Sequence, residues 1–144
     1  MTGASGCVLV RRIVPDAELP KRGSEGSAGL DLFCAEAAVL KSGTVQRIST
    51  GFAFEIPKGF FGLIEPRSSV SLKNITVFPT VVECDFRGEL FVTVRYDGEG
   101  DYRVQKHDRL GQLVVIPYAP VGVREVSELS ETKRGTGGYG STGR

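Results

Sequence analysis

The sequence predicts an all-β fold with at most one short helix, and two observations support this class. Nineteen Gly and seven Pro are distributed over 144 residues, and no long stretch repeats apolar residues at helical spacing. Gly and Pro favour tight turns, whereas short apolar runs bounded by such residues are typical of β-strands. We therefore expect many short strands packed as a β-barrel or β-sandwich.

The expected strands are short apolar or β-branched runs between turn residues. They cover residues 7–12, 30–33, 45–48, 52–56, 61–65, 90–94, 102–104 and 113–116. Gly51 separates two of them and is expected to interrupt the chain there. Residues 68–74 begin with Ser and contain two apolar residues, so one or two helical turns are expected in this segment.

Residues 77–94 carry two acidic residues at the end of an apolar run. Arg87-Gly88 and a second apolar run follow, which predicts a strand, a turn and a strand. Because side chains alternate along a strand, Glu83 and Asp85 are expected on one face. Either carboxylate could act there as a general base, and Glu83 is our first candidate.

The length and composition predict a single intracellular domain with a short C-terminal arm. A chain of 144 residues usually forms one domain, and its composition changes abruptly after residue 132. We expect a β-domain over residues 1–132 and a flexible Gly-rich arm over residues 133–144. Cys7, Cys34 and Cys84 show no metal-binding spacing, which favours a reducing compartment, cytoplasmic or nuclear.

The charge balance narrows the class of partner. Eighteen basic and seventeen acidic residues give a net charge of +1, which argues against nucleic acid or a membrane as the main partner. No apolar run approaches the ~18 residues that a membrane-spanning helix needs. Anionic small molecules remain open as ligands.

The last residues of the chain have the composition of a phosphate clamp. Glycines allow backbone N–H groups to approach an anion, hydroxyls add donors, and Arg134 offers a bidentate fork. Tyr139 lies among these glycines, where its ring could close over a base. The alternative is a disordered Gly-rich tail.

Two further clusters could bind an anion. Arg67 and Ser68 stand where a helix could begin, which favours anions, although an ordinary capped turn explains them equally. In residues 107–113, an Arg and a Gln at a strand end could contact phosphate, while Asp108 could pair with an Arg or help to order a magnesium shell. His107 is expected to be a surface turn residue.

Five segments together resemble the five motifs of the homotrimeric dUTPase family, in the same order and at the same spacing. They are residues 28–32, 66–68, 81–88, 108–113 and 134–143. The resemblance covers nearly the whole chain. It implies a distorted jelly-roll β-barrel and a homotrimer in which each active site contains residues of all three chains.

The resemblance also implies the reaction, which is magnesium-dependent hydrolysis of dUTP to dUMP and pyrophosphate. Mg²⁺ is expected to bind through substrate phosphates and water, without a protein metal site. Glu83 takes the position of the carboxylate that activates water, and Asp31 that of the acid that organises the site. The implied substrate-binding residues are Arg67, Ser68, Ser69, Thr80, Phe86, Gln112, Arg134, Tyr139, Gly140, Ser141 and Thr142.

This sequence departs from the family pattern at several of these positions. Glu83 and Phe86 stand where the family has Asp and Tyr, and Ser69 replaces a Gly. Residues 78–80, Phe-Pro-Thr, replace the glycine-containing hairpin tip that reads uracil, and the Pro has no N–H to donate.

Three functions are consistent with this pattern. The first is a dUTPase with a rebuilt hairpin, and the second is a pyrophosphohydrolase for another or modified deoxynucleoside triphosphate. The third is a binding or regulatory protein that has lost turnover. The retained Arg67, Ser68 and Gln112, with the arm, favour triphosphate binding in each case.

Overall fold

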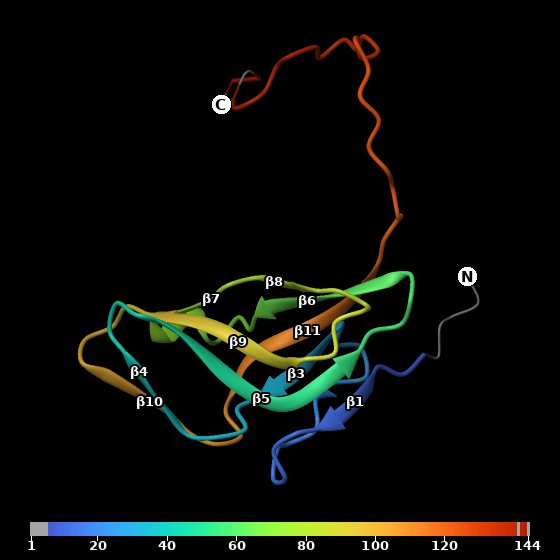
Figure 1. Ribbon diagram of the computed structural model, residues 1–144. Coiled ribbons are helices and arrows are strands. Elements are labelled where there is room, and N and C mark those ends of the chain that lie inside the picture. Colours follow the sequence, from blue (N-terminus) through green and yellow to red (C-terminus); the bar gives the residue numbers. More distant parts are fainter. Residues whose placement is uncertain (1–5, 141, 144) are drawn as a thin grey trace.

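The computed structural model describes residues 6–140, 142 and 143 and contains two main antiparallel sheets (Figure 1). One sheet has the order β1 (Leu9–Arg12), β5 (Val45–Glu55), β9 (Glu89–Tyr96) and β7 (Ile75–Val77). The other has the order β2 (Lys21–Arg22), β3 (Gly29–Phe33), β11 (Arg109–Pro117), β6 (Phe60–Pro66) and β8 (Thr80–Val82). A separate two-stranded ribbon pairs β10 (Asp101–Val104) with β4 (Ala38–Lys41).

The core lies between the two main sheets. In β9, buried residues alternate with partly exposed ones, as expected for a strand with one covered face. The middle of β5 is buried on both sides, with Phe52 and Phe54 less than 3% exposed. Removing a large apolar side chain from water contributes about 1.5–3 kcal/mol, so this interior fixes the relative positions of the strands that carry the site.

The all-β prediction, with at most one short helix, is confirmed for the described residues. The short helix is η1 (Ser71–Lys73), a single 3₁₀ turn inside the segment that the sequence marked. The two main sheets do not join into one closed barrel within a single chain. None of the helical structure described is long and apolar enough to cross a membrane.

The prediction of two strands separated at Gly51 is wrong, because β5 continues through this residue. The pairing with β9 shifts register between Ser49 and Ala53, and Gly51 has φ +76°. A Cβ at Gly51 would lie 2.5 Å from the Cβ of Ala17. The glycine therefore allows an irregularity within one strand, where we expected a turn between two.

The prediction that Glu83 and Asp85 share one strand face is also wrong. β8 ends at Val82 and pairs with β6, whereas β9 pairs with β5 and β7 in the other sheet. Residues 83–88 therefore cross from one sheet to the other, and the N–H of Phe86 donates to the carbonyl of Glu83 at 3.1 Å in a turn. Packed sheets lie about 10 Å apart, so the chain must leave its strand to make this crossing.

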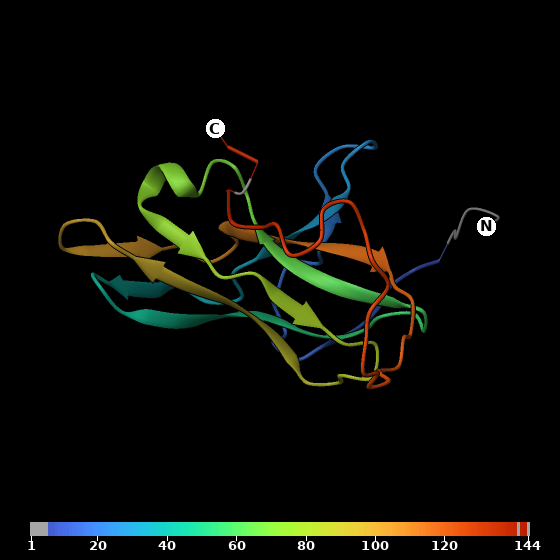
Figure 2. The same cartoon turned by 90° about the horizontal axis from the view of Figure 1, so that it is seen from above.

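The C-terminal residues leave the sheets after β11. The chain beyond Pro117 forms no strand or helix in its described part, and Figures 1 and 2 show it leaving from the end opposite the β4–β10 ribbon. Val121, Val123 and Leu129 in this segment are more than 80% exposed. The division at residue 132 and the intracellular location stay predictions.

Candidate active site

Asp31 is the centre of a charged cluster on the five-stranded sheet. Its side chain is only 10% exposed, and Nε of Arg67 lies 3.0 Å from its Oδ1 in an ion pair. Arg109 donates from Nη1 to Oδ2 at 3.3 Å. Two guanidinium groups thus face one carboxylate, which leaves a net positive charge where an anion could bind.

Strand pairing brings these three residues together from distant parts of the sequence. Asp31 lies on β3 opposite Gln112 of β11, and Arg109 begins β11. Arg67 follows the last residue of β6, which pairs with the other edge of β11. The cluster therefore depends on β11 lying between β3 and β6.

An open polar cleft of about 220 Å³ adjoins this cluster. Its lining residues come from loops and from β3 and β11, and they are Gly23, Ser27, Gly29, Asp31, Arg67, Ser68 and Gln112. Gln112 donates from Nε2 to the carbonyl of Pro66 at 3.0 Å, and any Cβ at Gly29 would collide with its Oε1. The cleft combines positive charge with hydroxyl and amide groups, which is the chemistry that binds phosphate. We refer to it as the Asp31 cleft.

Ser69 lies beside this cleft but does not line it. The residue is exposed, in a turn closed by the N–H of Val70 donating to the carbonyl of Arg67 at 3.0 Å. Among the residues described, the non-glycine positions with positive φ are Asn74, His107 and Tyr139. Ser69 therefore adopts a backbone conformation that does not require glycine.

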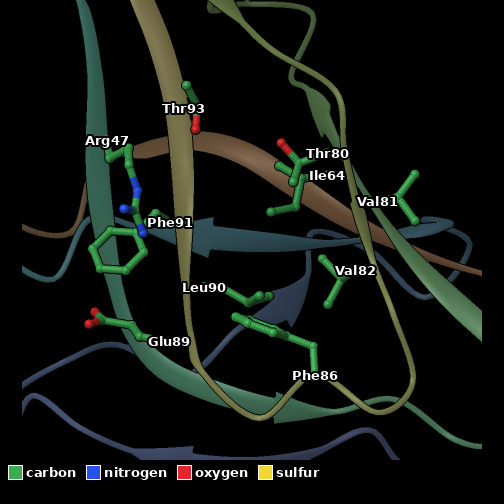
Figure 3. Close-up of a pocket in the computed structure, with 10 residues that line it drawn as sticks. All are labelled: Arg47, Ile64, Thr80, Val81, Val82, Phe86, Glu89, Leu90, Phe91 and Thr93. Atoms are coloured by element: carbon green, nitrogen blue, oxygen red, sulfur yellow. The ribbon is translucent and has the colours of Figure 1, made fainter.

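A second cleft, of about 190 Å³, lies between β8 and β9 (Figure 3). Thr80, Val82 and Phe86 line one side of it, and Figure 3 shows the Phe86 ring directed towards Leu90. On the β9 side the guanidinium of Arg47 stacks on the Phe91 ring, 4.0 Å from its centroid. We refer to this as the Phe86 cleft, and it suits a flat ring beside an aromatic side chain.

The expected hairpin tip at residues 78–80 is not formed, because residues 78 and 79 link β7 in one sheet to β8 in the other. This link, at one end of the Phe86 cleft, has few free backbone donors. The N–H of Phe78 already donates to the carbonyl of Thr93 at 2.9 Å, and Pro79 has none. The hydroxyl of Thr80 donates to the carbonyl of Phe78 at 3.2 Å. A base in this cleft must therefore be recognised by groups other than the backbone N–H groups of residues 78 and 79.

Glu83 is exposed in the turn that follows β8, close to the start of the C-terminal segment after Pro117. The side chain of Tyr118, directly after β11, lies close to that of Cys84. The charge of Cys84 raises the pKa of Tyr118, and the nearby charges of Glu83 and Asp85 raise it further. The last strand and the Glu83 turn therefore meet at this point.

The two clefts share no lining residue, and Glu83 lines neither of them. The structure thus brings together Asp31, Arg67, Ser68 and Gln112 in one group and Thr80 and Phe86 in another. It does not unite the two groups within one chain. The prediction of a single site that contains all of them is not tested by one chain.

The predicted arm residues make local contacts. Arg134 donates from Nε to the carbonyl of Gly137 at 2.8 Å, and Tyr139 is fully exposed with φ 49°. Gly140 has φ 88°, and Thr142 is exposed. Ser141 lies outside the described residues.

Asp108, the acidic residue expected to pair with an Arg or to help order magnesium, instead stabilises a turn. Asp108 accepts the N–H of Gln105 at its Oδ2 at 2.9 Å, which closes the turn before β11. His107 lies in this turn with a positive φ and is partly exposed, as the sequence predicted. In the described part of the chain, no three His, Cys, Asp or Glu side chains lie close enough to hold a metal ion.

Sequence reasoning missed part of the Asp31 cleft. Gly23 and Ser27, in the loop between β2 and β3, also line this cleft, and nothing in the sequence pattern predicts it. Arg109 was noted as an anion-binding candidate, and its pairing with Asp31 required the register of β3 and β11. A Gly and a Ser in a loop carry no signal that identifies them as ligands.

Comparison with known proteins gives matches over nearly the entire chain. The family model described as dUTPase matches residues 15–143. The deoxyuridine 5'-triphosphate nucleotidohydrolase of Alkaliphilus metalliredigens is 40% identical over 139 residues, which cover 94% of this chain and 96% of that protein.

Solved structures of phage proteins have the same fold. The dUTPase of Staphylococcus bacteriophage 80alpha with dUPNHPP superposes with a TM-score of 0.92 at 28% identity and covers 97% of this chain and 100% of that one. A variant of the dUTPase from phage phi11 of S. aureus, described as coordinating a structural Mg(II) ion, gives a TM-score of 0.80 at 25% identity. The match covers 85% of this chain and 98% of that one.

Proposed function

The chain belongs to the dUTPase family, and on that premise we propose that it hydrolyses dUTP to dUMP and pyrophosphate. The observation that carries this proposal is the Asp31 cleft, where two Arg side chains share one nearly buried carboxylate beside Ser68 and Gln112. The clefts and the turn between the sheets supply separate parts of the chemistry.

The triphosphate binds at the Asp31 cleft in this proposal. Arg67 is held by Asp31 at 3.0 Å and is 25% exposed, so its guanidinium is fixed in direction while part of it still faces the cleft. Ser68 and Gln112 add neutral hydrogen-bonding groups. Arg134, Tyr139, Gly140, Ser141 and Thr142 close over the phosphates and the base as a lid.

The nucleoside binds at the Phe86 cleft. The deoxyribose packs on the ring of Phe86, which is 44% exposed, and the base extends towards Thr80. Glu83 lies three residues before Phe86 and takes a proton from water as the water oxygen attacks the α-phosphorus. The bond from the α-phosphorus to the bridging oxygen breaks, and pyrophosphate leaves with the electron pair.

The two clefts belong to different chains of a homotrimer in our proposal. The separation of the Asp31 cleft from the Phe86 cleft within one chain supports this arrangement. The exposed apolar residues Val121 and Val123 support it too, because they lie on a segment that extends away from its own sheets and can cover another chain. Each chain is then a distorted jelly roll completed by its neighbours.

Magnesium is proposed to bind through phosphate oxygens and water. Among the described residues, Asp31 is the one carboxylate that lines the Asp31 cleft, and each of its oxygens is already paired with an Arg side chain. These residues fit a metal held mainly by its substrate, which is the usual mode for Mg²⁺. The ion would neutralise charge on the triphosphate.

Pyrophosphate release from a panel of deoxynucleoside triphosphates with Mg²⁺ tests the proposed function. We expect turnover of dUTP, loss of about a hundredfold or more in kcat in Glu83→Gln, and nucleotide binding close to that of the unchanged protein. Asp85→Asn is the matched control, because it removes a charge from the same turn and is expected to retain turnover.

Each other outcome selects a different function. Turnover of a different nucleotide would replace dUTP by that substrate. This outcome is worth testing because Pro79, in the link before β8, has no N–H to offer a base. Binding without turnover of any nucleotide would contradict enzymatic activity. Unchanged turnover in Glu83→Gln together with its loss in Asp85→Asn would move the base to Asp85.

A further inference from the structure

Arg87 bridges the turn that carries Glu83 to the end of β5. Its Nη1 donates to the carbonyl of Cys84 at 2.7 Å and to the carbonyl of Phe86 at 3.1 Å. Its Nη2 lies 3.4 Å from Oε1 of Glu55, the last residue of β5. One side chain thus contacts the turn at two points and the four-stranded sheet at a third.

These contacts fix the backbone on both sides of Asp85. The turn has a hydrogen bond of its own, from the N–H of Phe86 to the carbonyl of Glu83 at 3.1 Å. The Nη1 group of Arg87 donates to two carbonyls in that loop, and the planar guanidinium fixes the directions of these two hydrogen bonds. Glu55 is held in turn by the pairing of β5 with Leu9 in β1.

We propose that Arg87 is a positioning residue for Glu83 and Phe86, acting through the backbone of residues 83–88. The inference rests on the proposed function, in which Glu83 is the base. A glutamate has one more rotatable bond than an aspartate, so the precision of its carboxylate depends more on a fixed backbone. A displacement of about 1 Å can reduce a rate about a hundredfold.

The surroundings of Arg87 argue against direct contact with substrate. It lines neither the Asp31 cleft nor the Phe86 cleft but a separate hollow beside β1 and β5, together with Val10, Ala53 and Glu55. Both of its terminal nitrogens already face acceptors within this chain. Its effect on the reaction must therefore pass through the turn.

Substitution of Arg87 by Ala tests the proposal. We expect kcat on dUTP to fall about 10- to 100-fold and KM to rise by a smaller factor, because Phe86, which packs on the deoxyribose, can shift while the Asp31 cleft that binds the phosphates is untouched. Added guanidinium ion at millimolar concentration should restore part of kcat. Arg87→Lys should retain more activity than Arg87→Ala, because an ammonium can still reach one carbonyl.

Arg95→Ala is the matched control, since Arg95 also makes an exposed ion pair, with Asp97 at 2.8 Å, but lies at the other end of β9. It should leave kcat unchanged. Amide hydrogen exchange of residues 83–88 should accelerate in Arg87→Ala and not in Arg95→Ala. Equal unfolding midpoints in the two variants would exclude a general loss of stability as the cause.

The outcomes separate this proposal from the proposed function. Absence of dUTP turnover in the unchanged protein would overturn the proposed function. An active protein in which Arg87→Ala keeps the original kcat would overturn only the role of Arg87. Unchanged hydrogen exchange in the turn would overturn it as well.

Discussion

Replacing Asp31 by Asn is the most direct test of the charged cluster in the Asp31 cleft. The substitution keeps the size of the side chain and removes the charge that both guanidinium groups share. Arg67, at 3.0 Å, and Arg109, at 3.3 Å, would then face each other without a counter-charge. The amide can still accept from one Arg, but its NH₂ group would point towards the other.

The magnitude follows from burial. Hydrogen bonds to charged groups contribute about 1.5–3 kcal/mol, and removing one partner of a fully buried ion pair costs about 3–5 kcal/mol. Asp31 is 10% exposed, but the side chains of Arg67 and Arg109 are 25% and 46% exposed, so water compensates part of the loss. We expect the free energy of unfolding to fall by about 2 kcal/mol.

Urea denaturation at matched protein concentration measures this change, because the stability of the proposed trimer would depend on concentration. Asp101→Asn is the control. It breaks an ion pair with Lys41 at 2.6 Å whose side chains are 48% and 61% exposed, and it should cost about 0.2–1 kcal/mol. Equal losses in the two variants would refute the conclusion that Asp31 organises the cleft.

Two further predictions concern the arm and a buried thiol. Deleting residues 134–144 should lower kcat/KM on dUTP about a hundredfold without changing the mass of the oligomer, because the lid donors are lost, and full turnover would show that the arm is dispensable. Burial, with the charge of Asp108, raises the pKa of Cys34 from 9.0 to about 12. The thiol is therefore protonated in both the folded and the unfolded state below pH 9. Above pH 9 only the unfolded state releases the proton. The free energy of unfolding should therefore fall by about 1.4 kcal/mol per pH unit up to pH 12. Denaturation of Cys34→Ala between pH 8 and 11 should show a slope that is shallower by this amount, with Cys7→Ala as an exposed control, and parallel slopes would contradict the assignment.

The sequence predicted most of the strands, because each of these is bounded by local turn residues, but it did not predict β2, β4 or β7. It could not predict that β5 continues through Gly51, because a glycine with positive φ occurs both in turns and in strand irregularities. The end of β8 at Val82 could not be predicted either, because that boundary depends on which sheet each neighbouring strand joins. Local patterns identify elements, whereas pairing between distant strands decides where an element must stop.

The site was predictable to a similar extent. The resemblance identified Asp31, Arg67 and Gln112 as members of motifs, and the structure places them in one cleft. It gave no information about Ser27, which enters the cleft because β2 pairs with β3. Nor did it identify Arg87 as a bridge, because its partner Glu55 lies on a strand of the other sheet.

Because Glu83 lies in a turn, its additional methylene need not displace its carboxylate. On a strand, the pleat fixes the direction of each side chain, and a longer acid would place its oxygen about 1 Å beyond the required point. In a turn, the backbone dihedrals can retract the Cα and return the carboxylate to the same place. That adjustment is useful only if the altered turn is rigid, and residues 83–88 are held by one backbone hydrogen bond and by three contacts of Arg87. In the proposed function, the longer acid at Glu83 and the contacts of Arg87 are therefore two parts of one arrangement, in which the backbone of residues 83–88 sets the reach of the base.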